Sequence, residues 1–167
     1  MTRLVAKIGF VLVAGALITG CSKGNEAAVE VRNSRAVSAE TEKTSSRILE
    51  MLAVKGKVTE SGAMTAPCTD SGSDEKTFRA RHPWSVHQAP FAELETGMER
   101  LRRELPKDGW EIVKDGPDSS AAKSPQPVAE SAGREFAVDV RLHKASSVGN
   151  APDLLEVTVE SACYRSE

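Results

Sequence analysis

The stretch FAVDVRLH, residues 136–143, decides the fold together with LLEVTVESAC, residues 154–163. In both stretches the side chains alternate between an apolar set and a mostly polar one. One parity holds Phe136, Val138, Val140, Leu142, Leu155, Val157, Val159, Ser161 and Cys163, and the other holds Ala137, Asp139, Arg141, His143, Glu156, Thr158, Glu160 and Ala162. Alternation of this kind predicts strands with one buried face and one solvated face. We therefore expect an antiparallel sheet that is covered on one side.

More strands are expected earlier in the chain. A weakly patterned strand is predicted at 57–65 and a clearly alternating one at 76–87. Pro83 has no backbone N–H to donate, so the second of these strands should lie at a sheet edge or carry a bulge there. Short apolar segments predict two further strands at 110–114 and 127–131.

Two segments have helical spacing instead. The first helix is predicted at roughly 38–55, where Lys55 and Gly56 supply a typical end. Its apolar stripe could be core or a docking face for another protein. The second helix has Pro90 in its first turn, and its apolar residues recur at intervals of three and four: Phe91, Leu94, Met98, Leu101 and Leu105. The fold class predicted is α+β, a two-layer sandwich with a mainly antiparallel sheet of about five strands and two helices packed on one face.

The N-terminus has the layout of a secretory signal. Arg3 and Lys7 precede eleven uncharged, mostly apolar residues at 8–18, a run shorter than the roughly 20 residues needed to span a bilayer. The residues that follow, through Gly20 and Cys21, resemble the lipobox of bacterial lipoproteins, which implies cleavage between these two residues and lipidation of Cys21. A plain secretory signal, with Cys21 incidental, is the alternative.

This interpretation divides the chain into three parts. Residues 1–20 are the signal peptide, residues 21–36 hold the lipidated cysteine and a flexible tether, and residues 37–167 form a single domain. The protein is then expected at the cell membrane, held by its lipid on the extracytoplasmic face, because two acyl chains on one residue anchor a protein stably.

The remaining cysteines form an even pair. In a compartment where disulfides persist, Cys68 and Cys163 are expected to be bonded; two buried free thiols are the alternative. Removal of residues 1–20 takes away two basic residues and no acidic one, so the net charge of the chain changes from −2 to −4. Such a balance does not favour nucleic-acid binding.

Several short motifs carry a resemblance. They are His82-Pro83-Trp84 before the second helix, Leu105-Pro106 and Gly109-Trp110 after it, and Ser161-Ala162-Cys163-Tyr164 near the end. With these motifs the domain is similar to small lipoproteins of actinobacteria whose role is uncharacterised. The resemblance covers most of the mature chain and implies no activity.

No residue pattern in the sequence points to catalysis, a cofactor or a metal. The three histidines, His82, His87 and His143, lack metal-ligand spacing, although a fold could still bring them together. Trp84 and Trp110 flank the second helix and could be core residues or a ligand-stacking pair. The exposed sheet face should hold Arg79, Arg81 and Arg141 among acidic neighbours.

These features favour a non-catalytic binding or accessory module of the cell envelope. Its partner would be an envelope protein or a small ligand, contacted through Arg79, Arg81, Arg141 or the two tryptophans. One alternative is a structural subunit of an envelope or export complex, which a large contiguous apolar patch would indicate. Another is an unrecognised hydrolase, which a pocket that gathers a histidine with a carboxylate or serine would indicate.

Overall fold

The structure is a computed structural model that describes residues 29–59, 61–68, 77–146 and 150–167. The predicted signal peptide, the cleavage site at Gly20 and the lipidation site at Cys21 lie outside the described residues. Within the described part of the chain, no helix is long and apolar enough to cross a membrane.

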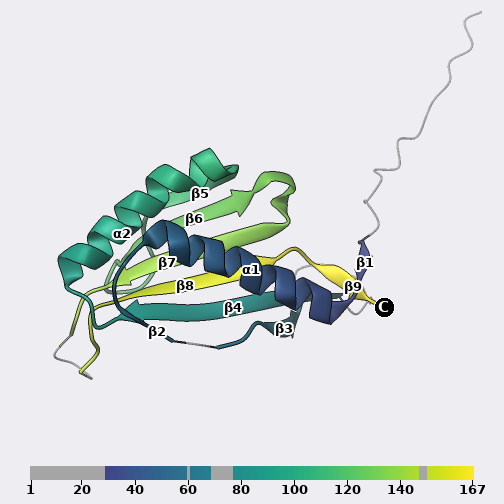
Figure 1. The fold of residues 1–167 in the computed structure, drawn as a ribbon, viewed down its shortest axis with the longest axis horizontal. Coiled ribbons are helices and arrows are strands. Elements are labelled where there is room, and N and C mark those ends of the chain that lie inside the picture. Colours follow the sequence, from purple (N-terminus) through teal and green to yellow (C-terminus); the bar gives the residue numbers. More distant parts are fainter. Residues whose placement is uncertain (1–28, 60, 69–76, 147–149) are drawn as a thin grey trace, which may run out of the picture.

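A twisted mixed sheet forms one layer of the domain (Figure 1). Its strands lie in the order β1-β9-β4-β8-β7-β6-β5, and β2 and β3 pair with the other edge of β4. The pairing of β1 with β9 is parallel, and the other pairs are antiparallel. The strands are β1 (Val31–Arg32), β2 (Lys57–Val58), β3 (Met64–Pro67), β4 (Thr77–His87), β5 (Trp110–Pro117), β6 (Pro125–Ser131), β7 (Phe136–His143), β8 (Leu154–Ser161) and β9 (Tyr164–Ser166).

The α+β class is confirmed, but the expected sheet of about five strands was too small, because the described residues form nine. Alternation predicted the long strands β4, β7 and β8, and short apolar segments predicted β5 and β6, which extend beyond the expected bounds. The other four have two to four residues each, too few to show a period. The single strand expected at 57–65 is in fact split into β2 and β3, both paired with β4.

Pro83 explains that split. On one side of β4, Pro83 pairs with Thr158 of β8. On the other side, β2 pairs with the C-terminal end of β4 and β3 pairs with its N-terminal half, so neither strand pairs with Pro83. The Ser61 hydroxyl donates to the Pro83 carbonyl across this gap. The proline lacks an N–H, and this stretch of β4 has no strand pairing on the side of β2 and β3. As a whole, however, β4 lies inside the sheet and has no register shift at Pro83, so the expectation of an edge strand or a bulge was wrong.

The first helix, α1 (Ser34–Leu52), begins four residues earlier than predicted. Asn33 is its N-cap, and its side-chain oxygen accepts hydrogen bonds from the N–H groups of Arg35 and Ala36 at 3.1 and 3.2 Å. Together with the pairing of β1, this cap shows that the ordered domain begins before residue 37. The predicted flexible tether, 21–36, therefore extended too far at its C-terminal end.

The second helix, α2 (Phe91–Glu104), lies where the apolar spacing placed it and continues into a 3-10 helix at Leu105–Asp108. The guanidinium of Arg100 donates to the carbonyls of Leu52 and Ala53, which α1 leaves unpaired at its C-terminus. Gly97 permits this close approach, because a Cβ there would lie 2.3 Å from the Val54 side chain.

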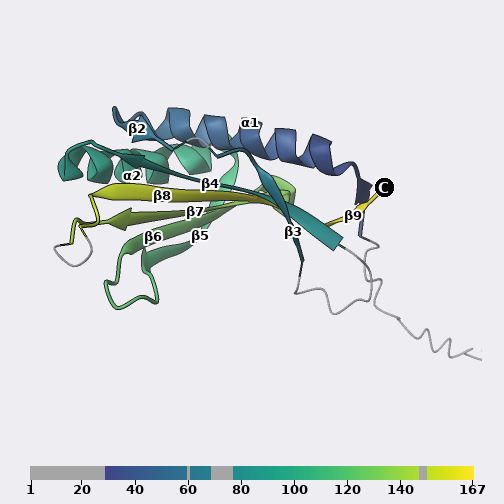
Figure 2. The same cartoon turned by 90° about the horizontal axis from the view of Figure 1, so that it is seen from below.

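Both helices cover the same face of the sheet, and the core lies between the two layers (Figure 2). Its fully buried members come from both helices and from the strands β4, β6, β7 and β8: Ile48, Leu52, Val86, Leu94, Met98, Leu101, Leu105, Ala129, Val138, Val140, Leu155, Val157 and Val159. The predicted disulfide is present, with Cys68 after β3 joined to Cys163 in the link between β8 and β9. The opposite face of the sheet carries no helix (Figure 2).

Candidate functional site

The helix-free face of the sheet contains a hollow of about 270 Å³. Short side chains lie across its middle, with Ala137 opposite Glu160 and Thr158 opposite Asp139 in the strand register. Longer charged side chains from β4, β7 and β8 stand around them. We call this surface the open face and define it by Arg79, Arg81, Gln126, Val128, Ala137, Asp139, Arg141, His143, Glu156, Thr158 and Glu160.

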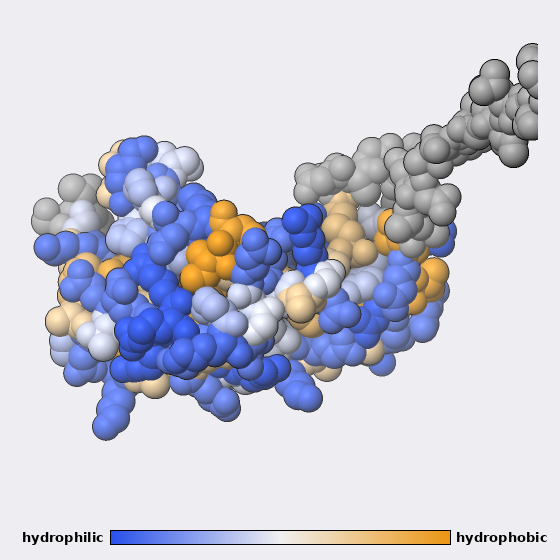
Figure 3. All heavy atoms as spheres, turned by 90° about the horizontal axis from the view of Figure 1, so that it is seen from above, coloured by the Kyte–Doolittle hydropathy of each residue, from blue (hydrophilic) through white to orange (hydrophobic). Residues whose placement is uncertain are grey.

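Figure 3 shows the molecule from above the view of Figure 1, that is, from the side of α2 and β5. The surface there is mostly hydrophilic, dips in the middle and carries one apolar patch at the dip (Figure 3). The described residues with large exposed apolar side chains are Val31, Met64 and Val113, which come from three different strands.

At one side of the open face two arginines share a carboxylate; Arg81 and Glu160 line the hollow, and Arg79 lies beside them. Arg79 Nη1 lies 3.2 Å from Glu160 Oε2, and Arg81 Nε lies 2.5 Å from Glu160 Oε1. Each arginine therefore takes a different oxygen of the same group. The predicted contact residues Arg79 and Arg81 are thus brought together, and their charges are partly compensated.

The other side of the open face is built around Asp139. Arg141 Nη2 donates to Asp139 Oδ2 at 2.9 Å, and Gln126 Nε2 donates to both carboxylate oxygens at 2.9 and 2.7 Å. The hydrogen bond to Asp139 raises the pKa of Arg141 above its ordinary value. Arg141 Nε is buried without a partner among the described residues. The third predicted arginine is therefore fixed across the hollow from the first two.

A serine, a histidine and a carboxylate meet at the end of the open face. Ser124 Oγ lies 3.4 Å from His143 Nδ1, and His143 Nε2 lies 2.9 Å from Glu156 Oε2. This is the combination that would indicate a hydrolase. However, Ser124 is only 5% exposed, and its backbone N–H and C=O both bond to Asp118. A nucleophile must reach its substrate, so the arrangement favours a structural role in closing the loop between β5 and β6.

Asp118 holds that loop together. Its Oδ1 accepts hydrogen bonds from the Ser120 N–H, the Ser120 hydroxyl and the Ser124 N–H at 3.0, 2.6 and 3.1 Å. The hydrogen bond from the Ser120 hydroxyl is the largest cause that lowers the pKa of Asp118 below its ordinary value, and the two backbone N–H groups contribute in the same direction.

The lowered pKa predicts an acid-dependent contribution to stability. Because the folded pKa lies below the unfolded one, ionised Asp118 stabilises the fold above the unfolded pKa, and this contribution is lost as the pH falls through the folded pKa. We expect Asp118→Asn to flatten the acid side of a plot of unfolding free energy against pH, measured by urea denaturation between pH 2 and 7. An unchanged slope in the variant would contradict this assignment.

The two tryptophans lie on the other side of the sheet from the arginines. Trp84 is 6% exposed and donates from Nε1 to the Ser45 hydroxyl of α1, and Trp110 is 8% exposed in the core. Each also borders a separate hollow at the edge of the helix layer, about 460 Å³ beside Trp84 and about 550 Å³ beside Trp110. The structure therefore does not bring the tryptophans together with the arginines or with each other.

The histidines are also separated. His82 lies on the helix side of β4 beside Trp84, whereas His143 lies on the open face. No group of three or more His, Cys, Asp or Glu residues in the described part of the chain is arranged to hold a metal ion.

Sequence reasoning missed residues of the β5–β6 loop and of the start of β6 that support the open face. Gln126 of β6 is 5% exposed and links Lys114 of β5 to Asp139 of β7. It lies one residue before the strand that the sequence predicted at 127–131. The Asp-Ser-Ser sequence at 118–120 was an available signal for the Asp118 turn, because aspartate side chains commonly bond to the backbone two residues on. No family model, curated protein or solved structure matches this chain.

Proposed function

We propose that the chain is an extracytoplasmic lipoprotein, anchored to the cell membrane through Cys21, and that it is a non-catalytic module that binds an envelope protein through the open face. The observation that carries this proposal is the pairing of Cys68 with Cys163. Disulfides persist in oxidising compartments. The chain has three cysteines, so the pairing of Cys68 with Cys163 leaves Cys21, at the lipobox position, outside the disulfide.

The chemistry of the open face supports a polar protein contact. Arg79, Arg81 and Arg141 are balanced by Asp139, Glu156 and Glu160, so the surface offers both signs of charge at fixed positions. Charges of alternating sign select a partner by complementarity more than they add affinity. The rigid strands beneath them keep the pattern in place.

The size of the hollow favours a protein over a small ligand. A volume of about 270 Å³ is slightly below the roughly 300 to 1,000 Å³ of typical small-molecule sites, which are also mostly apolar. The alternative of a structural subunit is less well supported, because Val31, Met64 and Val113 lie on three different strands.

Site-specific photocrosslinking in living cells tests both parts of the proposal. A photoreactive amino acid replaces Thr158 at the hollow or, as the control, the exposed Lys43 on α1. We expect Thr158 to give one discrete crosslinked protein in the membrane fraction and Lys43 to give none. Arg81→Glu, which reverses a charge beside the hollow, should weaken that crosslink.

The anchor is tested in the same cells with Cys21→Ala. This variant should leave the detergent phase on phase separation or accumulate as an uncleaved precursor. Detergent partitioning identical to that of the original chain would refute the lipid assignment. Equal crosslinking from Thr158 and Lys43, or a Thr158 crosslink that Arg81→Glu does not change, would refute the open face as the binding surface.

A further inference from the structure

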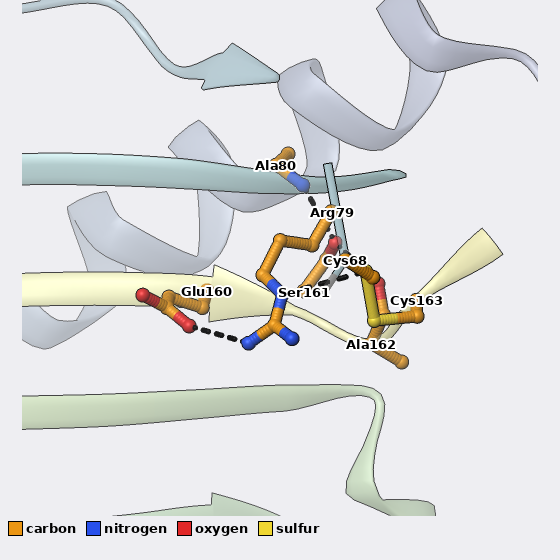
Figure 4. Close-up of a disulfide and its surroundings, with 7 residues drawn as sticks. All are labelled: Cys68, Arg79, Ala80, Glu160, Ser161, Ala162 and Cys163. Atoms are coloured by element: carbon orange, nitrogen blue, oxygen red, sulfur yellow. Dashed lines mark hydrogen bonds and ion pairs between the residues drawn. A yellow bond between two sulfur atoms is a disulfide. The ribbon is translucent and has the colours of Figure 1, made fainter. Parts of the chain in front are cut away.

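The disulfide has a cation beside one of its two sulfur atoms. Arg79 Nε donates a hydrogen bond to Cys68 Sγ at 3.4 Å (Figure 4). Cys68 directly follows the edge strand β3, and Cys163 lies in the two-residue link between β8 and β9. Both cysteines are only partly buried. The bond is therefore at the surface, and its two sulfurs differ in their surroundings.

Glu160 helps to keep Arg79 in this position. The carboxylate binds Nη1 of Arg79 at 3.2 Å, while Nε of the same guanidinium faces the sulfur (Figure 4). Arg81 pairs with the other oxygen of Glu160. An arginine stays charged at any physiological pH, so the Cys68 sulfur always has a positive charge next to it.

This charge matters in thiol–disulfide exchange. An incoming thiolate attacks one sulfur, and the other sulfur leaves as a thiolate. A neighbouring cation stabilises a thiolate, and a more stable thiolate leaves faster. Arg79 therefore favours departure of Cys68 over departure of Cys163.

We propose that the Cys68–Cys163 disulfide is an exchange site for a dithiol partner, in which Cys163 is the attacked sulfur and Cys68 is the leaving thiolate held by Arg79. In the first step a thiolate of the partner bonds to Cys163 Sγ, the disulfide breaks, and its electron pair goes to Cys68 Sγ. In the second step the partner's second thiolate attacks the partner sulfur that is bonded to Cys163. A disulfide forms within the partner, and Cys163 leaves as a thiolate. The partner is oxidised to a disulfide, and the two cysteines are reduced.

The exchange would also change the open face. In the disulfide form, Arg79 pairs with Glu160. In the reduced form, the Cys68 thiolate and the Glu160 carboxylate are two anions that compete for one guanidinium. Reduction therefore adds negative charge near Glu160, which lines the hollow. The exchange chemistry itself does not depend on the proposed protein partner.

The rate of reduction tests the role of Arg79. The purified full-length chain is treated with excess dithiothreitol at one pH, and free thiols are counted over time. Arg79→Gln should slow the reduction by about three- to tenfold, because loss of the cation makes the Cys68 thiol less acidic and a less acidic thiol leaves more slowly. Arg79→Lys, which keeps the cation, should retain most of the rate. Arg81→Gln is the matched control, because it removes the other arginine on Glu160, and it should stay within about twofold of the original rate.

The position of the mixed disulfide tests the direction of attack. A short pulse of glutathione is stopped with acid, free thiols are alkylated, and peptides are mapped by mass spectrometry. Glutathione should be found on Cys163 and the alkyl group on Cys68. Glutathione mainly on Cys68 would overturn the proposal. So would equal rates for Arg79→Gln and Arg81→Gln, or faster reduction in Arg79→Gln, which would show that the arginine only stabilises the surrounding strands.

Discussion

Replacing Cys68 and Cys163 together with alanine is expected to lower the free energy of unfolding by about 4 to 5 kcal/mol. The two residues are 95 positions apart, so the bond removes much of the conformational freedom of the unfolded chain. It also joins the end of the edge strand β3 to the link between β8 and β9. A domain of this size has only about 5 to 15 kcal/mol of stability in total, so this loss is a large fraction of it.

Urea denaturation of the purified full-length chain measures this loss. The control is Cys21→Ala, which changes a cysteine outside the disulfide and should leave the unfolding free energy unchanged. The original chain, reduced and alkylated, should match the double variant. A loss of less than about 1 kcal/mol in the double variant would show that the bond contributes far less than loop closure predicts.

The sequence predicted the long elements well, because their evidence is local. The alternation in β7 and β8 identified the buried face of each strand, and the apolar spacing of α2 placed that helix within a residue or two. The short strands were not predictable in this way. β1 forms because its two residues pair with β9 at the other end of the chain, and a two-residue strand has no period to detect.

The candidate site was likewise predicted only in part. Strand parity was enough to place Arg79, Arg81 and Arg141 on one exposed face, because successive side chains of a strand point to opposite sides. Parity could not show that Glu160 is shared by two arginines or that Gln126 supports Asp139. Those contacts depend on the register between strands, which only the folded chain defines. The contact of Arg79 with the disulfide is of the same kind.

Trp84→Ala should be the most destabilising single substitution proposed here, with a loss of about 3 to 5 kcal/mol of unfolding free energy. The indole is buried between β4 and α1, and its removal creates a cavity and leaves the buried Ser45 hydroxyl without its donor. Arg81→Gln is the matched control on the same strand. Its side chain points to the open face, where an exposed ion pair is worth only about 0 to 1 kcal/mol.

Trp84→Ala and Arg81→Gln should also have different effects on partner binding. At a temperature where both variants are folded, Trp84→Ala should leave the Thr158 crosslink intact, because the ring faces the helices and not the hollow. Arg81→Gln should weaken the crosslink with little loss of stability. The opposite result, a stable Trp84→Ala variant without its crosslink, would assign the binding surface to the hollow of about 460 Å³ beside Trp84. The helix side of the sheet would then hold the site, and the charged open face would only be solvated.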